Sequence, residues 1–126
     1  MARILIIDDQ PEVRAMLSLM LKRAGHETLE AKDGRRGLSV VASYKLDLVV
    51  TDILMPEKEG IETIIELRKT FPTLKIIAIS GGGDGRNFDY LPMAERLGAH
   101  ATLKKPFSNQ DLLSAIDKLL GGNESE

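Results

Sequence analysis

The sequence predicts an α/β fold, a doubly wound parallel sheet of five strands in the order 2-1-3-4-5 with helices on both faces. Two observations predict it. Short apolar runs of strand length alternate five times with segments whose apolar residues recur at helical spacing. The second run is more polar than the others, which places that strand at an edge of the sheet and favours this strand order.

The predicted strands are short and, apart from the second, rich in Ile, Val and Leu. Such runs suit strands that are buried on both faces of a parallel sheet, because helices cover both faces. The strands are expected at Arg3–Ile7, His26–Glu30, Leu46–Thr51, Lys75–Ser80 and Ala101–Lys104.

The predicted helices are marked by apolar periodicity and by residues that favour helix ends. Pro11 suits the first turn of the first helix, and Gly25 ends it. Ser108 and Asp111 form an S-x-x-D capping pattern before the last helix. The apolar faces are expected at Val13, Met16, Leu17, Met20 and Leu21; Leu38, Val41 and Ala42; Ile61, Ile64 and Ile65; Leu91, Ala94 and Leu97; and Leu112, Leu113, Ile116, Leu119 and Leu120.

Composition limits the class of protein. The 126 residues suit one domain, expected over residues 1–120, with 121–126 as a flexible polar tail. A net charge of −2 offers no basic patch for direct binding to nucleic acid. The absence of cysteine excludes disulfides, thiolate metal sites and a Cys nucleophile. No apolar run approaches the roughly 18 residues of a membrane span, so no membrane contact and a cytoplasmic location are expected.

Three carboxylates follow strands at the predicted ligand crevice. Asp8 and Asp9 end the first strand and Asp52 ends the third, and the switch point of this strand order lies between those strands. At roughly 5 Å and an effective dielectric of about 20, each pair of charges repels by about 3 kcal/mol. Either the pKa values rise or a cation compensates, and hard oxygen ligands suit Mg²⁺. A carboxylate can also attack phosphorus to give an aspartyl phosphate.

Two other strand ends supply groups that suit a phosphoryl ligand. Ser80 offers a hydroxyl and Lys105 an ammonium, and phosphoryl transfer depends on positioning and cationic stabilisation. Lys104 competes with Lys105 for this role, and Pro106 favours Lys105.

Four motifs, in order along the chain, resemble the receiver domain of two-component response regulators, the CheY-like family of flavodoxin-like folds. The motifs are Ile6-Ile7-Asp8-Asp9, Asp52-Ile53-Leu54-Met55-Pro56, Ile79-Ser80-Gly81 and Lys105-Pro106-Phe107. The likeness covers nearly the whole chain. It implies a phosphorelay signalling domain, not an enzyme beyond its own phosphoryl transfer and autodephosphorylation, whose phosphorylation switches partner binding.

The resemblance also implies a role for each site residue. The phosphoryl donor would be a phosphohistidine on a sensor histidine kinase or a histidine phosphotransfer protein. Ser80 would move to hydrogen-bond the phosphoryl group, and Lys105 would pair with it. The implied phosphoacceptor is Asp52, and the implied Mg²⁺ ligands are Asp8, Asp9, Asp52 and the backbone carbonyl of Leu54.

Other expectations concern the switch and the partner surface. The Lys105–Pro106 peptide is expected to be cis, as in receivers of this kind. Thr102 stands where receivers often carry an aromatic switch residue, so this position offers no aromatic ring for the switch. The face formed by the fourth helix, fifth strand and fifth helix is expected to bind an output partner, unidentified, or a second copy of the chain.

Plainer interpretations of single residues and rival functions account for less of the sequence. Asp8-Asp9 alone could be a helix cap, His26 and His100 are expected to be surface or packing residues, and Met16 and Met20 core residues. A phosphatase of the haloacid dehalogenase type would want an acid where Leu54 stands. A flavodoxin-like cofactor binder is disfavoured by 4% aromatic residues. A receiver-like binding module that is never phosphorylated is disfavoured because all the site groups are present.

Overall fold

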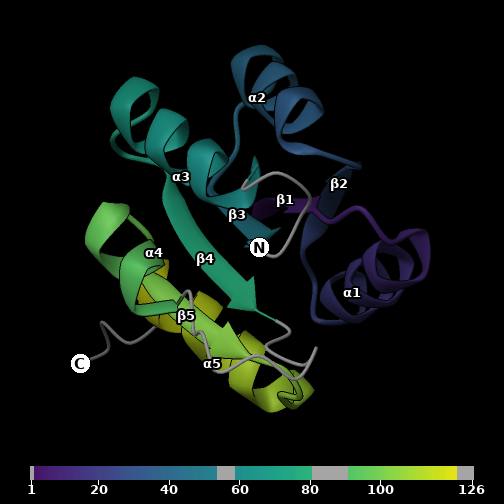
Figure 1. Ribbon diagram of the computed structural model, residues 1–126. Coiled ribbons are helices and arrows are strands. Elements are labelled where there is room, and N and C mark those ends of the chain that lie inside the picture. Colours follow the sequence, from purple (N-terminus) through teal and green to yellow (C-terminus); the bar gives the residue numbers. More distant parts are fainter. Residues whose placement is uncertain (1, 54–58, 81–90, 122–126) are drawn as a thin grey trace.

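A computed structural model describes residues 2–53, 59–80 and 91–121. Within these residues the chain forms a five-stranded parallel sheet in the order β2-β1-β3-β4-β5, flanked by helices (Figure 1). The predicted fold class and strand order are confirmed. The strands are β1 (Arg3–Ile7), β2 (Glu27–Ala31), β3 (Leu48–Asp52), β4 (Lys75–Ser80) and β5 (Ala101–Lys104). The helices are α1 (Pro11–Arg23), α2 (Gly34–Ser43), α3 (Glu59–Thr70), α4 (Leu91–Leu97) and α5 (Asn109–Leu119).

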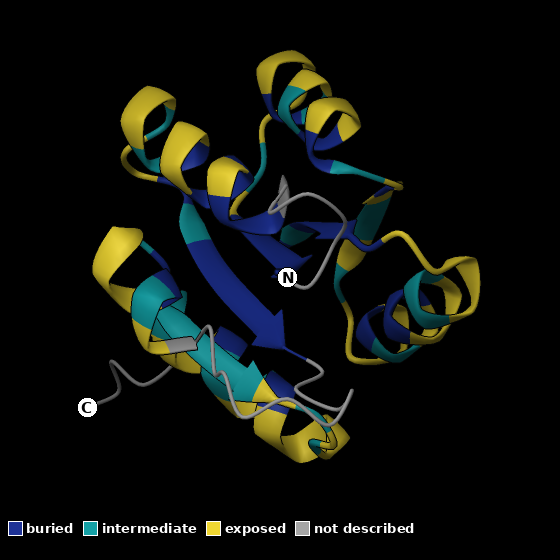
Figure 2. Ribbon diagram, in the orientation of Figure 1, coloured by how far each residue is buried: buried dark blue, intermediate teal, exposed yellow. Residues whose placement is uncertain are grey.

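Each central strand contributes side chains to two apolar layers, because successive side chains of a strand point to opposite faces of the sheet. Leu5 and Ile7 of β1 pack into the layer beneath α2, α3 and α4. Ile4 and Ile6 of the same strand pack into the layer beneath α1 and α5. The burial pattern shows the outcome: β4 lies between the two helical layers, and the helices expose their outer surfaces (Figure 2).

The helix ends follow the capping residues. Pro11 is the first residue of α1, and Gly25 follows its end with a φ of 97°, a conformation that favours glycine. Gly98 plays the same part after α4, with a φ of 137°. Ser108 and Asp111 form the predicted capping box at the start of α5.

Several predictions of detail were wrong. The edge strand β2 is displaced by one residue, and β3 begins two residues later than expected but includes Asp52. Met16 is 61% exposed and Ile65 43% exposed, so neither is a core residue. Helices in an outer layer bury only a narrow stripe against the sheet, and in α1 that stripe is Leu17, Ser18 and Leu21.

Both histidines accept a hydrogen bond from a backbone N–H, which is a more specific role than the surface or packing role expected from the sequence. His26 Nδ1 accepts a hydrogen bond from the backbone N–H of Ala2 at 3.1 Å. His100 Nδ1 accepts one from the backbone N–H of Ile76, also at 3.1 Å. Each histidine directly precedes an edge strand, β2 or β5, and so each ties the start of that strand to its neighbour.

Two further expectations concern the ends and the surroundings of the domain. Apart from Gly121, the expected tail falls outside the described residues. Among the helices that the structure does describe, none has the length and apolar character needed to cross a membrane.

Candidate functional site

The sheet brings the three predicted carboxylates together. Ile7 pairs with Thr51 across β1 and β3, so Asp8 and Asp52 follow neighbouring paired residues at the same end of the sheet. One carboxylate oxygen from each of Asp8, Asp9 and Asp52 lies within 4.8 Å of the others. A cluster that sequence reasoning placed at the switch point is therefore present in the fold.

Two of these carboxylates are buried and one faces solvent. Asp8 is 2% exposed and Asp52 is 7% exposed, whereas Asp9 is exposed. Burial raises the pKa of Asp8 to about 6, and the negative charges of Asp52 and Asp9 act in the same direction. The backbone N–H of Gln10, which donates to Asp8 Oδ1 at 2.8 Å, and the charge of Lys105 partly oppose that rise in pKa. The cluster thus carries charge that a cation would compensate.

Lys105 places a positive charge at this cluster. Its Nζ atom lies 3.8 Å from Oδ2 of Asp52, and its backbone N–H donates to the carbonyl of Ser80 at 2.9 Å. The Lys105–Pro106 peptide is cis, as expected. Lys104, the competing lysine, is an exposed residue at the end of β5.

Ser80 ends β4 beside the acidic cluster. Asp52 pairs with Ile79 across β3 and β4, which puts Ser80 one residue beyond the level of Asp52. The side chain of Ser80 is almost fully buried, with 1% exposure. Ser80 therefore lies at the same edge of the sheet as the carboxylates. The predicted ligand Leu54 and the glycine-rich segment 81–90 lie outside the described residues.

Comparison with known proteins identifies the family. A family model described as the response regulator receiver domain matches residues 4–117. The chain belongs to the response regulator receiver family. It is 35% identical to protein PilH of Pseudomonas aeruginosa over 97% of this chain and 100% of PilH. Some curated relatives are longer, and the chain spans 50% of one transcriptional regulator and 25% of another.

Solved structures agree with this assignment. A response regulator receiver domain protein from Clostridium thermocellum superposes with a TM-score of 0.87 at 31% identity, over 98% of each chain. The response regulator TrrA from Thermotoga maritima, solved in complex with Mg²⁺-BeF, gives a TM-score of 0.83 at 32% identity, over 95% of this chain and 100% of TrrA. The protein is a receiver domain of two-component response regulators with an aspartate cluster at its phosphorylation site.

The donor set of this receiver domain fits a hard divalent cation. Three carboxylate oxygens that converge within 4.8 Å are ligands of the type that Mg²⁺ prefers. The exposure of Asp9 leaves one side of the cluster open to water, which Mg²⁺ usually retains in its coordination shell. Asp8, Asp9 and Asp52 thus form a possible Mg²⁺ site.

The position of the receiver switch residue holds a polar contact. Thr102 pairs with Ala78 across β4 and β5, and its Oγ1 donates to Oε2 of Glu95 in α4 at 3.4 Å. This exposed contact joins β5 to α4 without an aromatic ring. Sequence reasoning identified the departure at Thr102 but not its partner.

Arg14, which contacts the backbone of a site residue, was not identified from the sequence. Arg14 Nη1 donates to the backbone carbonyl of Asp8 at 2.7 Å. A signal was available, because Arg14 lies near the N-terminal end of α1, where a positive charge is opposed by the helix dipole. The position of Arg14 near the start of a helix and close in sequence to Asp8 and Asp9 thus indicates that its side chain has a specific partner.

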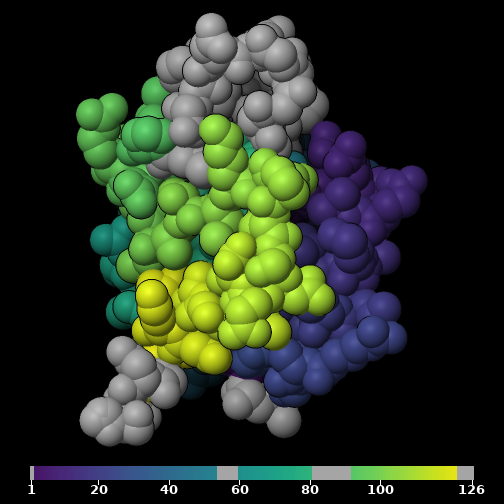
Figure 3. Space-filling model, turned by 90° about the horizontal axis from the view of Figure 1, so that it is seen from below, coloured from purple at the N-terminus to yellow at the C-terminus, as the bar shows by residue number. Residues whose placement is uncertain are grey.

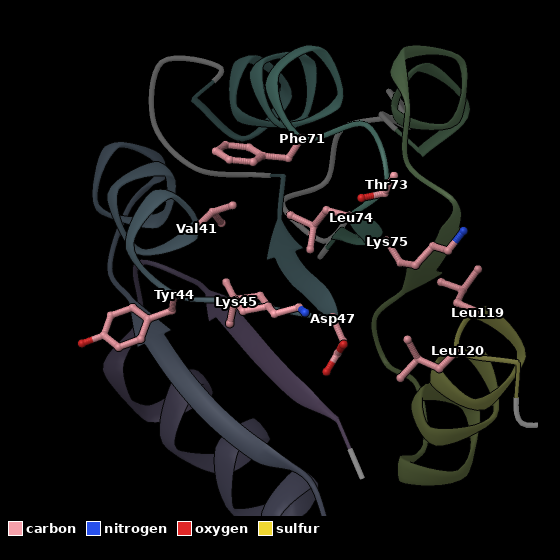
Figure 4. Close-up of a pocket in the computed structure, with 11 residues that line it drawn as sticks. Val41, Tyr44, Lys45, Asp47, Phe71, Thr73, Leu74, Lys75, Leu119 and Leu120 are labelled. Carbon is pink, nitrogen blue, oxygen red and sulfur yellow. The ribbon is translucent and has the colours of Figure 1, made fainter.

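A cavity of about 520 Å³ has none of the three clustered aspartates in its lining, which is drawn in Figure 4. It is lined by residues that precede β3 and β4, such as Asp47 and Leu74, and by the end of α5 at Leu119 and Leu120. Parallel strands carry their ligands beyond their carboxyl ends, and this cavity is at the opposite ends. The cavity is therefore not at the edge of the sheet where Asp8, Asp9 and Asp52 converge.

Proposed function

We propose that this receiver domain takes a phosphoryl group onto Asp52 and uses the modification to switch the binding of a partner. The observation that carries the proposal is the 3.8 Å contact between Lys105 and Asp52 inside a cluster of converging carboxylates. It combines a nucleophile, a neighbouring cation and oxygen ligands for a metal at one edge of the sheet. We assign the domain to residues 1–120.

The transfer itself needs little from the protein beyond position and charge. An oxygen of the Asp52 carboxylate attacks the phosphorus of a phosphohistidine, the new O–P bond forms, and the N–P bond to the imidazole breaks. The departing imidazole nitrogen keeps the electron pair and takes a proton from solvent. Lys105 then pairs with an oxygen of the phosphoryl group, since its ammonium already lies beside the attacking carboxylate.

Asp8, Asp9 and Asp52 would hold a Mg²⁺ ion, with the backbone carbonyl of Leu54 as a further ligand. When bound, the ion would neutralise negative charge on the phosphoryl oxygens. The TrrA complex with Mg²⁺-BeF supports this assignment by similarity. Within this chain, the convergence of the three carboxylates supports it as well, because Asp52 and Asp9 add to the burial that raises the pKa of Asp8.

Phosphorylation would act on the partner surface through the end of β4. The phosphoryl group adds about −1.5 to −2 charges, which recruits Lys105 and draws the hydroxyl of Ser80 toward it. The two residues are joined by a backbone hydrogen bond of 2.9 Å, through which a shift of one strand end would reach the other. The adjoining surface is formed by α4, β5 and α5 (green to yellow in Figure 3).

We assign that surface to the output partner, or to a second copy of the chain. It exposes Leu97 of α4, which is 36% exposed, and Lys104 of β5. The donor would be a sensor histidine kinase or a histidine phosphotransfer protein, as is general for receiver domains. Because the proposed donors act on receiver domains in the cytoplasm, we assign the domain to that compartment.

The direct test is the intact mass of the protein after incubation with a small acyl phosphate. We expect one phosphoryl adduct that requires both Mg²⁺ and Asp52. The Asp52→Ala variant and a sample with EDTA serve as the two controls. No adduct on the native chain under any condition, or an adduct that persists in Asp52→Ala, would show that Asp52 is not the acceptor.

A further inference from the structure

Arg14 connects three elements beside the acidic cluster. It belongs to α1, and its side chain is only 18% exposed. Its Nη1 donates to the backbone carbonyl of Asp8 at 2.7 Å, just past the end of β1. Its Nε donates to Oε1 of Glu30 in β2 at 3.4 Å. The guanidinium therefore spans from the helix to the ends of two neighbouring strands.

The hydrogen bond from Arg14 helps to hold Asp8 in place, although Asp8 lies just beyond the paired part of β1. The paired register of β1 ends at Ile7. The backbone N–H of Asp8 still donates to the carbonyl of Ala31 at 3.1 Å, and its carboxylate accepts from Gln10 at 2.8 Å. The carbonyl of Asp8 is held by Arg14, with a short charge-assisted bond. The backbone of Asp8 is thus held on both sides, which sets the direction of its carboxylate.

We propose that Arg14 is a positioning residue for divalent-cation binding at the acidic cluster. It does not contact the cation. It fixes the backbone of Asp8 so that the carboxylate converges with those of Asp9 and Asp52. The inference rests on the proposed function, because it assumes that these carboxylates hold Mg²⁺. Groups that hydrogen-bond to a metal-binding residue orient that residue, and their loss typically weakens metal binding about 10- to 100-fold.

A second hydrogen bond joins α1 to β2. It allows an experiment to distinguish the positioning of Asp8 by Arg14 from the packing of α1 against β2. Ser18 Oγ and Thr28 Oγ1 are 2.7 Å apart and join α1 to β2 one helical turn beyond Arg14. Ser18 is buried, with 3% exposure, and this pair does not involve Asp8. A loss of helix docking alone would be reproduced by removing Ser18. A loss of positioning would be specific to Arg14.

The test is a calorimetric titration of the full chain with Mg²⁺, paired with urea unfolding in EDTA. We expect Arg14→Gln to weaken Mg²⁺ binding by about 10-fold or more, as for other supporting residues of metal sites. Ser18→Ala should lower the stability in EDTA and leave the affinity for Mg²⁺ within about 2-fold of the native value. Arg14→Lys keeps the charge but lacks the fork that reaches two acceptors, so an intermediate loss is expected.

The outcomes separate this inference from the function on which it rests. If the native chain binds Mg²⁺ no better than Asp8→Asn, the metal site itself is wrong and the inference fails with it. If the native chain binds Mg²⁺ and both Arg14 variants bind it equally well, only the inference fails. It fails also if Ser18→Ala weakens binding as much as Arg14→Gln does, because the effect would then be helix docking. Should Arg14→Gln not fold, the Arg14→Lys titration decides alone.

Discussion

Lys105 is attached to the end of β4 by its backbone and to Asp52 by its side chain. Its N–H donates to the carbonyl of Ser80 at 2.9 Å, while its ammonium lies 3.8 Å from Asp52 Oδ2. The lysine side chain is 29% exposed and the Asp52 side chain 8% exposed. The ammonium can therefore move from the carboxylate to a phosphoryl oxygen without moving its backbone. Lys105 thus links Asp52 to the strand that carries Ser80 through one side-chain contact and one backbone hydrogen bond.

Replacement of Lys105 by Met should slow phosphorylation of Asp52. The ammonium offsets negative charge where the phosphoryl group arrives, and loss of one such stabilising group typically costs about 100- to 1,000-fold in rate. The rate of adduct formation with an acyl phosphate, followed by intact mass, measures the effect. Lys104→Met is the matched control, because Lys104 is the adjacent residue and is exposed. Equal rates for the two variants would remove Lys105 from the chemistry.

Replacement of Asp8 by Asn should stabilise the metal-free protein at neutral pH. Asp8 is 2% exposed, and its pKa is raised from 3.8 to about 6, mainly by burial. A raised pKa favours the folded state below pH 3.8, and that contribution is lost as pH rises through about 6. At pH 7.5 the buried charge is therefore a cost, on the order of 2 to 3 kcal/mol, which the neutral amide removes.

Urea unfolding in EDTA at several pH values measures this effect. The advantage of Asp8→Asn should be largest at pH 7.5 and should shrink toward pH 4, where the native Asp8 is itself protonated. Mg²⁺ should reverse the order of stability at pH 7.5, because only the native chain binds it well. A stability difference that does not vary with pH would contradict the raised pKa of Asp8.

The fold and most of the site could be predicted because they depend on local patterns. Apolar strand runs, each ending in a polar residue, fix both the sheet and the position of Asp8, Asp52 and Ser80 at one edge. The partners of these residues depend on tertiary contacts. The bond from Arg14 to Asp8 and that from Thr102 to Glu95 join different elements, and no spacing in the sequence encodes them. Met16 was misplaced because helical spacing does not fix how wide the buried stripe is.

Replacement of Gly60 by Ala should lower stability and impair the site. A Cβ at this buried position of α3 would clash with the backbone of Ile53, where it would meet the carbonyl oxygen at 2.7 Å. Ile53 directly follows Asp52 and donates its N–H to Ile79 at 2.9 Å, so the strand end has little room to yield. Overpacking of this kind typically costs about 1 to 3 kcal/mol, which equals or exceeds the roughly 1 kcal/mol that alanine gains over glycine in a helix.

Gly37→Ala provides the comparison for Gly60→Ala. A Cβ at Gly37 would meet only side-chain atoms in its near contacts, the Cδ1 and Cγ1 atoms of Ile7. The end of a side chain can shift where a backbone cannot, so we expect a smaller loss, offset by the gain in helix propensity. Urea unfolding and adduct yield measure the two variants together. Equal losses of stability at the two glycines would mean that contact with the backbone of Ile53 is not what limits this site.

Acidification should loosen the start of the edge strand β5 through His100. The pKa of His100 lies below 6.5 because of partial burial first, and then because of the charges of Lys75 and Arg68. Its Nδ1 must be unprotonated to accept the N–H of Ile76. For a histidine with a lowered pKa, the contribution to stability is present above pH 6.5 and is lost as pH falls through the folded-state pKa.

An NMR titration should place the His100 midpoint below 6.5, and Lys75→Met should move it upward. A midpoint at or above 6.5 in the native chain, or one that Lys75→Met leaves unchanged, would show that these charges do not control the contact.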